Sequence, residues 1–223
     1  MIPILAWNCQ GAGKKHFVRT FKELCFEAKP EVAVIVEPRV SGRRADTIIR
    51  KLNFSNSHRV EARGFAGGIW ILWKDVNVDV SVIFNHTQFI HTRITCSGFS
   101  FLFTAVYGSP QESWRYFLWK NLENLGQDIT EPWLLGGDFN AILSGAERKN
   151  KLGRCGIANK RFVECVSAAG LLDLGAWGSK FTWYRGGDHA RLDRFLCNQS
   201  WRTMFPEVSV IHGPRAGSLA YTS

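Results

Sequence analysis

Polar side chains that could act on a phosphate ester follow apolar segments of this sequence, at the points where those segments end. Asn8 ends the first such segment, Glu37 the second and Tyr107 a later one, while Asp138 and Asn140 follow a fourth. Asn8 and Glu37 taken singly have ordinary explanations, such as a turn-forming role for Asn8. Residues at strand ends can converge on one rim of a sheet. Together they predict a single site.

The residue types in this set suit metal-dependent hydrolysis of a phosphodiester. Mg²⁺ prefers hard oxygen ligands and takes only one or two carboxylates, which Glu37 can supply, with Asn8 beside it for the metal shell or a phosphate oxygen. Asp138 is a candidate general base for the attacking water. Asn140 can bind the phosphate, and Tyr107 can donate a hydrogen bond to the developing charge. We therefore expect Mg²⁺, with Mn²⁺ as the alternative ion, and no small organic cofactor.

The elements that must position these residues are short buried strands separated by amphipathic helices. Helices are expected over 15–28, 45–52, 111–125 and 159–169, the third with Trp114 and Phe117 on the same apolar side as Leu118, Leu122 and Leu125. Strands are expected over 2–8, 32–36, 69–73, 76–84, 89–96, 99–107, 133–137, 180–184, 192–197 and 207–211. Two batches of strands separated by helices predict an α/β fold, a four-layer α/β/β/α sandwich of two mixed sheets with outer helices. A three-layer α/β/α domain is the alternative.

The amino-acid composition limits the kinds of binding partner and the cellular compartment that we expect for this protein. The 223 residues include 28 Lys and Arg against 19 Asp and Glu, a formal net charge of +9. A basic surface favours a polyanionic partner such as nucleic acid, although solubility alone could explain the charge. The six cysteines are scattered without metal-ligand spacing, as in reducing compartments. Neither a signal peptide nor an apolar run of the ~20 residues needed to span a bilayer is evident, so we expect an intracellular protein of nucleus or cytoplasm, not secreted and not in a membrane.

Six short segments occur in the order and spacing of the endonuclease/exonuclease/phosphatase superfamily: residues 7–11, 36–38, 106–108, 137–140, 181–183 and 191–194. From residue 2 to about 217 the chain most resembles the endonuclease domain of plant LINE-type (non-LTR) retrotransposons. This resemblance implies one DNase I-like domain over 1–223 that nicks DNA. It also implies an adjoining reverse-transcriptase domain in intact relatives, which this sequence does not contain.

The resemblance also implies roles for the residues at the strand ends. Asn8 and Glu37 would hold the divalent metal. Asp138 would align or deprotonate the attacking water, and Asn140 would position the phosphate. Tyr107 would contact the phosphate or the leaving group.

Two further groups of residues follow from the same resemblance. Asp193, in the segment 191–194, would support the site. The loop after residue 140 is basic, and Arg148, Lys149, Lys151 and Arg154 could bind DNA phosphates. A solvated charged loop is an equally good interpretation of these four residues.

The pattern breaks after Ser218. Superfamily members carry Ser-Asp-His here, whereas Leu219 and Ala220 follow Ser218 in this chain. We therefore expect a domain truncated at its C-terminal catalytic segment, with the last core strand missing, an open sheet edge and impaired turnover. The alternatives are a non-catalytic, basic nucleic-acid-binding remnant of the same fold and, less favoured, a phosphatase that acts on a small phosphoester.

Overall fold

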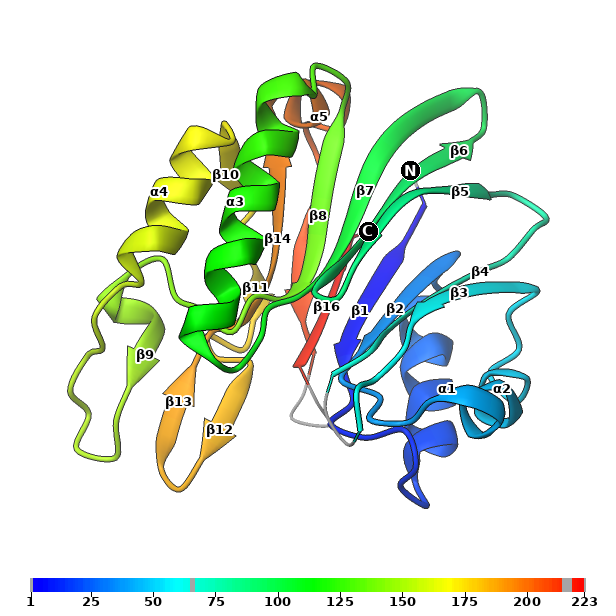
Figure 1. Ribbon diagram of the computed structural model, residues 1–223, viewed down its shortest axis with the longest axis horizontal. Coiled ribbons are helices and arrows are strands. Elements are labelled where there is room, and N and C mark those ends of the chain that lie inside the picture. Colours follow the sequence, from blue (N-terminus) through cyan, green and yellow to red (C-terminus); the bar gives the residue numbers. More distant parts are fainter. Residues whose placement is uncertain (1, 65–66, 214–217, 223) are drawn as a thin grey trace.

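The computed structural model describes residues 2–64, 67–213 and 218–222, with the backbone alone over the last of these ranges. Two sheets stack face to face, and helices cover both outer faces (Figure 1). The expected four-layer α/β/β/α sandwich is confirmed, and the three-layer alternative is wrong.

The first sheet is mixed and has seven strands in the order β11-β15-β16-β1-β2-β4-β3. β1 runs parallel to β2 and antiparallel to β16. The strands are β11 (Trp177–Gly178), β15 (Val210–His212), β16 (Ser218–Thr222), β1 (Ile4–Asn8), β2 (Val32–Val36), β4 (Ile69–Trp73) and β3 (Asn56–Val60).

The second sheet is also mixed, with six strands in the order β10-β14-β8-β7-β6-β5. β8 is parallel to β7 and antiparallel to β14. The strands are β10 (Leu171–Asp173), β14 (Asp193–Asn198), β8 (Trp133–Asp138), β7 (Phe99–Tyr107), β6 (Phe89–Cys96) and β5 (Asp79–His86). A third, small sheet joins β12 (Trp183–Arg185), β13 (Asp188–Ala190) and β9 (Arg148–Lys149), so part of the expected basic loop is a strand.

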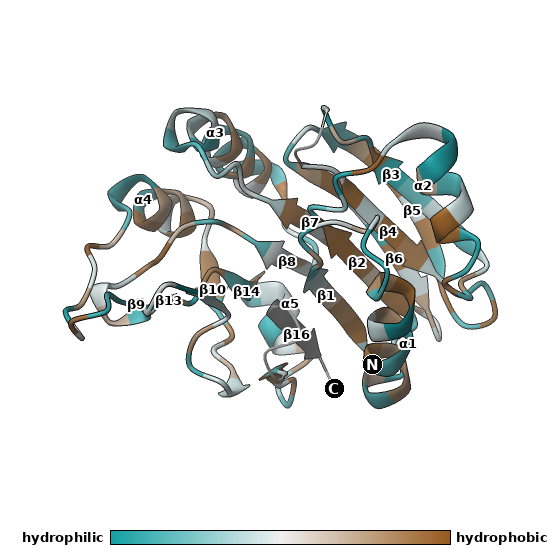
Figure 2. Ribbon diagram, turned by 90° about the horizontal axis from the view of Figure 1, so that it is seen from below, coloured by the Kyte–Doolittle hydropathy of each residue, from teal (hydrophilic) through white to brown (hydrophobic). Residues whose placement is uncertain are grey.

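The apolar strands β1 and β2 are buried along their whole length because both of their faces are covered. Alternate residues point to opposite faces, so Ala6 packs between the two sheets while Leu5 and Trp7 pack under the helices. Trp7 stacks on Phe17 of α1 (Phe17–Ala28), with 5.3 Å between ring centroids. Figure 2 shows the hydrophobic strands β1, β2 and β7 in the middle of the molecule, with α1 and most of the other helices at its periphery.

The remaining helices are α2 (Gly42–Ile49), α3 (Glu112–Asp128), α4 (Lys160–Ala168) and α5 (Gln199–Met204), with a 3-10 turn over Gly145–Glu147. On α3, Leu118 and Leu122 are buried against the second sheet as expected. Trp114 and Phe117 are not, because the buried face of α3 centres on Leu118, Trp119 and Leu122. Within the described ranges, no helix combines the length and apolar character needed to cross a membrane.

The expectation that the last core strand is missing is wrong. Residues Ser218–Thr222 form β16, which lies between β1 and β15 and pairs with both. A ladder of backbone hydrogen bonds needs an extended chain, not particular catalytic side chains, so Leu219 and Ala220 can occupy it. The edge of β1 is therefore covered.

Candidate active site

Asn8 and Asp138, from different sheets, are in contact at one rim of the sandwich. Asn8 is the last residue of β1 in the first sheet, and Asp138 is the last residue of β8 in the second. The side-chain amide of Asn8 donates to Oδ2 of Asp138 over 2.7 Å, and both residues are buried. The stacking of the sheets thus builds the centre of the site.

The Asp138 carboxylate is held on both oxygens. Oδ1 accepts from the backbone N–H of Asn140 at 2.7 Å, and Oδ2 accepts from the amides of Asn8 and Asn140 at 2.7 and 3.2 Å. The Asn140 amide also donates to the carbonyl of Gly108 at 2.9 Å. Asn140 therefore positions Asp138 in this arrangement.

Burial raises the pKa of Asp138 to about 6, with a smaller increase from the nearby Glu37 carboxylate. The hydrogen bonds from Asn140 and Asn8 stabilise the charged form and limit the increase. A carboxyl group with this pKa is ionised at neutral pH and still basic enough to accept a proton from water. Asp138 has the properties of a general base.

Glu37 lies at the end of β2 and enters the same cleft. Its Oε1 accepts from the Arg39 guanidinium, with Nε at 2.9 Å. Among the described residues, its other oxygen, Oε2, accepts no hydrogen bond. The Glu37 side chain is only 14% exposed, so one carboxylate oxygen is available inside a partly desolvated cleft.

Strained backbone is concentrated around this cleft. Left-handed φ angles are uncommon for residues other than glycine and store energy that the surrounding structure must offset. Such angles occur at four residues that line the cleft: Gln10 (φ 48°), Glu37 (57°), Arg39 (55°) and Asn140 (49°). Their concentration is typical of a functional site.

The cleft has a volume of about 560 Å³ and a cationic wall. Asn8, Glu37, Asp138 and Asn140 all line it. Four arginines line it as well: Arg39, Arg115, Arg148 and Arg185. Guanidinium groups bind phosphate oxygens in a bidentate manner, so these arginines could offset the negative charge of a phosphate bound near the carboxylates.

Tyr107, at the end of β7, lies close to this centre. Burial raises its pKa well above the ordinary range, and the carboxylates of Glu37 and Asp138 raise it further. Its hydroxyl therefore stays protonated and can serve as a hydrogen-bond donor. The Tyr107 side chain lines a second cavity beside the cleft.

The donor set of the cleft fits a hard divalent cation. It offers a carboxylate from Glu37, a carboxylate from Asp138 and the amide oxygen of Asn8, the last of which accepts from the Gln10 N–H at 3.1 Å. No group of three or more His, Cys, Asp or Glu gathers in the described part of the chain. Mg²⁺ does not require such a cluster, because it commonly uses one or two carboxylates and keeps several waters.

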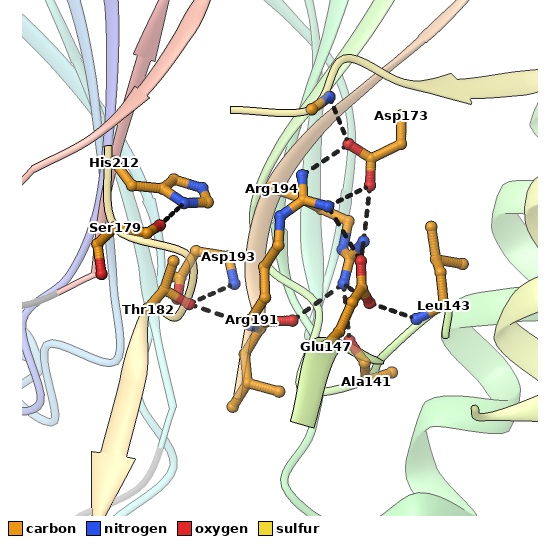
Figure 3. Close-up of polar contacts among 12 residues, drawn as sticks. Ala141, Leu143, Glu147, Asp173, Ser179, Thr182, Arg191, Asp193, Arg194 and His212 are labelled. Atoms are coloured by element: carbon orange, nitrogen blue, oxygen red, sulfur yellow. Dashed lines mark hydrogen bonds and ion pairs between the residues drawn. The ribbon is translucent and has the colours of Figure 1, made fainter. Parts of the chain in front are cut away.

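Asp193 lies beside Asp138 in the adjacent strand, since the two are register partners in β14 and β8. Its backbone N–H donates to Oγ1 of Thr182 at 3.1 Å, and that hydroxyl also accepts from Leu192 at 3.0 Å (Figure 3). Asp193 is buried and is not among the residues that line the cleft. The structure therefore places it behind the site.

A buried network of four charges lies next to this segment (Figure 3). Arg194, 0% exposed, binds Glu147 at 2.8 Å and Asp173 at 2.7 Å. Arg191 binds the same two carboxylates at 3.0 and 2.7 Å. Glu147 directly precedes Arg148, so the network fastens the start of the basic segment to β14.

The four basic residues expected to bind DNA have different positions. Arg148 lines the cleft. Lys149, Lys151 and Arg154 are exposed and do not line it, although Lys151 lies with Trp183 in a neighbouring hollow. The backbone of Ser218 pairs with Asn8, which places position 218 at the rim.

Sequence reasoning missed several residues of this site. Arg39 could have been noticed because it follows Glu37 by two positions. Arg115 is on a helix and Arg185 on a hairpin, with no local signal that they face the cleft. Glu147 and Asp173 are far from Arg194 in sequence, so nothing short of the fold pairs them.

Comparisons with known proteins agree with this architecture. Residues 5–221 match the model of the Endonuclease/Exonuclease/phosphatase family. No curated protein matches the sequence.

Several solved structures share the fold at low identity. The endonuclease domain of TRAS1, a telomere-specific non-LTR retrotransposon, has a TM-score of 0.76 at 14% identity, over 99% of this chain and 96% of that one. An AP endonuclease from Archaeoglobus fulgidus has a TM-score of 0.73 at 14% identity, over 100% and 99%. The 3′ phosphatase NExo from Neisseria, bound to a product DNA hairpin, has a TM-score of 0.69 at 17% identity, over 100% and 99%. At such identities the likeness shows the fold alone.

Proposed function

Because the chain belongs to the Endonuclease/Exonuclease/phosphatase family, we propose that its cleft is a divalent-metal-dependent phosphodiesterase centre that nicks DNA. The observation that carries the proposal is the contact between Asn8 and Asp138, which unites two sheets at a cleft that also holds Glu37. The arginine wall and the net charge of +9 favour DNA as the polyanionic substrate. The similarity to the TRAS1 domain and the resemblance of the motifs support a retroelement origin.

Each residue of the cleft has a definite task in this proposal. Glu37 and Asn8 would hold Mg²⁺, which supplies neutralisation of the charge on a phosphate oxygen when it is bound. Asp138, positioned by Asn8 and Asn140, accepts the proton of the attacking water. Tyr107 donates from its protonated hydroxyl toward the developing charge.

We propose that turnover is slow because the Asp-His pair of the C-terminal catalytic motif is missing. In the resemblance, the serine is followed by an Asp-His pair, in which the His contacts or protonates the scissile phosphate and the Asp holds the imidazole or the metal shell. In this chain Leu219 and Ala220 follow Ser218 instead. Loss of a general acid typically removes about 10²–10⁴ of rate. We therefore propose an endonuclease that retains its metal and phosphate site but has impaired activity.

A second candidate function is nucleic-acid binding without cleavage. The observation that favours it is the four-arginine wall, which needs neither a metal nor a general acid to bind phosphates. The two functions differ in what the carboxylates do. In a binder they are dispensable, and their removal relieves repulsion of the DNA backbone.

Two assays on the same variants separate the candidates. Glu37→Gln should abolish Mg²⁺-dependent nicking of supercoiled plasmid while DNA binding, measured by fluorescence anisotropy over a range of salt, is kept. Glu23→Gln is a matched control, because Glu23 pairs with Arg19 on the exposed side of α1. If wild type and Glu37→Gln show equal residual nicking and equal salt-sensitive binding, the chain is a binder and the phosphodiesterase proposal fails.

A further inference from the structure

A second cavity of about 360 Å³ adjoins the catalytic cleft. Pro110 lines both, and Tyr107 lines the second cavity while its hydroxyl is influenced by Glu37 and Asp138 of the first. The two cavities therefore share Pro110 as a common lining residue and are neighbours. A group bound in the second cavity would be directly adjacent to a phosphate bound in the first.

An exposed aromatic surface borders this cavity. Trp114, in the first turn of α3, lines the cavity and is 55% exposed. Phe117 is 51% exposed, and its ring centroid lies 6.0 Å from that of Trp114. Tyr116 is 39% exposed and carries the guanidinium of Arg161 over its ring. An exposed cluster of large aromatic rings beside a cleft indicates a binding surface rather than a core.

Hydrogen bonds hold the wall of this cavity in place. Gln88 is buried and its amide holds two parts of the wall, donating to the Trp114 carbonyl at 2.9 Å and accepting from the Ser109 N–H at 2.7 Å. Arg115 fastens the same segment from behind, with Nη1 donating to the carbonyls of Ser109 and Pro110 at 2.7 and 2.9 Å. The position of Trp114 is thus fixed by hydrogen bonds that do not involve its ring. The indole face is left available.

The charges on the rim suit a nucleotide. Arg63 lines the same cavity as Trp114 and is exposed. Glu61 also lines it, but its Oε1 accepts from Arg59 at 2.7 Å, so its negative charge is paired. An aromatic face and a cation on the rim of one cavity form the combination with which single-stranded nucleic acid is bound, by stacking of bases and contact to the backbone.

We propose that this cavity receives one nucleobase, unstacked from the strand whose phosphate occupies the catalytic cleft, with the indole of Trp114 as its stacking partner. This inference rests on the proposed function, because the neighbouring phosphate fixes the strand. The volume lies within the range of roughly 300–1,000 Å³ found for small-ligand pockets. Stacking on an aromatic face is tolerant of sequence, so the cavity would select an unpaired or easily unstacked nucleotide rather than a particular base.

The test is the affinity for a short single-stranded oligonucleotide, measured by fluorescence anisotropy in EDTA so that no cleavage occurs. Trp114→Ala should weaken binding by roughly 10-fold or more, since base–aromatic stacking contributes about 1–3 kcal/mol per base. Trp114→Phe should retain most of the affinity because it keeps an aromatic face. Phe26→Ala is the control, because Phe26 is 82% exposed on α1 and lines neither cavity. Equal unfolding midpoints for all four proteins exclude a general loss of fold.

A second measurement identifies the base. Each nucleotide of the oligonucleotide is replaced in turn by an abasic unit. At the position that enters the cavity, the abasic unit should weaken binding by wild type and should have no further effect on Trp114→Ala, because both changes remove the same contact.

The outcomes separate this inference from the proposed function. If wild type binds DNA but Trp114→Ala binds as tightly as Phe26→Ala, the inference is overturned and the proposed function stands. If Trp114→Ala weakens binding equally at every abasic position, the indole does not stack a base and the inference is also overturned. If wild type binds no DNA, both fail.

Discussion

The amide of Asn8 and the carboxylate of Asp138 are in contact at 2.7 Å although 130 positions separate them in the chain. Each residue ends a strand of a different sheet, so the contact forms only when the sheets are stacked. The candidate site therefore depends on the stacking of the two sheets and not on any local segment.

This contact is one of the influences on the pKa of Asp138. Burial raises the pKa of Asp138 to about 6 in the metal-free protein, and the hydrogen bond from Asn8 opposes that increase. Asn8→Ala should therefore move the titration to higher pH, since the charged form loses a donor. Carboxyl ¹³C chemical shifts of Asp138 followed from pH 3 to 9 measure it, with Asn121→Ala on the exposed side of α3 as control. Titration near pH 4 in wild type, or a lower value in Asn8→Ala, would show that this account of the site is wrong.

The sign of the linkage follows from the same pKa. Between the ordinary Asp value of 3.8 and about 6, folded Asp138 holds a proton that the unfolded chain has released. This residue therefore lowers stability as pH rises through that window. This loss of stability accompanies a carboxyl group whose pKa is raised toward neutrality by burial, and Asp138→Asn should remove it.

The position of Ser218 opposite Asn8 suggests how activity can be restored. Residues that face each other in an antiparallel ladder point to the same side, and Asn8 points toward Asp138. The backbone of position 218 pairs with Asn8 at the rim of the cleft, so Ser218→His should raise the nicking rate, by up to about 10² if it acts as a general acid. Leu219→His is the matched control, because the backbone of position 219 pairs with Trp7 instead of Asn8. Equal rates for the two variants in a plasmid-nicking assay would contradict this placement.

Removal of Glu147 should destabilise the protein. Arg194 is 0% exposed and pairs with Glu147 and Asp173. Without Glu147, the guanidinium groups of Arg194 and Arg191 would have to share the carboxylate of Asp173. Loss of one partner from a buried ion pair costs on the order of 3 kcal/mol, which urea denaturation of Glu147→Gln would measure.

The control for that experiment is Glu23→Gln, which breaks an ion pair of the same chemical type on the surface of α1. It should change the free energy of unfolding little, because exposed pairs are screened by solvent. If the two variants were equally stable, the buried network would not be what fastens the segment of Arg148 to β14.

Much of the fold and of the cleft could be predicted from the sequence because the evidence for them is local. Asn8, Glu37 and Asp138 each end an apolar run, and the ends of buried strands meet at a rim. Short family motifs added the family to which the fold belongs. The four layers were predicted from two batches of strands separated by helices, and the uninterrupted apolar run Val32–Val36 fitted a strand covered on both faces.

What could not be predicted depends on contacts between distant segments. Trp114 and Phe117 lie on the apolar side of α3 in the helical pattern, but the second sheet covers only the part around Leu118 and Leu122. β16 was expected to be missing because its catalytic motif is altered, yet an extended backbone is sufficient for it to pair with β1. A motif of side chains does not show whether the backbone of the same segment pairs with a neighbouring strand.

We propose above all that Asp138 is the base of a metal-dependent phosphodiesterase. The most direct measurement is the single-turnover cleavage of end-labelled duplex DNA, with protein in excess, by wild type and Asp138→Asn in Mg²⁺ and in EDTA. We expect slow cleavage by wild type in Mg²⁺ that leaves a 3′-hydroxyl, none in EDTA, and a rate at least about 10²-fold lower for Asp138→Asn. Cleavage at the same rate by both proteins, or no cleavage by wild type even with protein in excess, would contradict it.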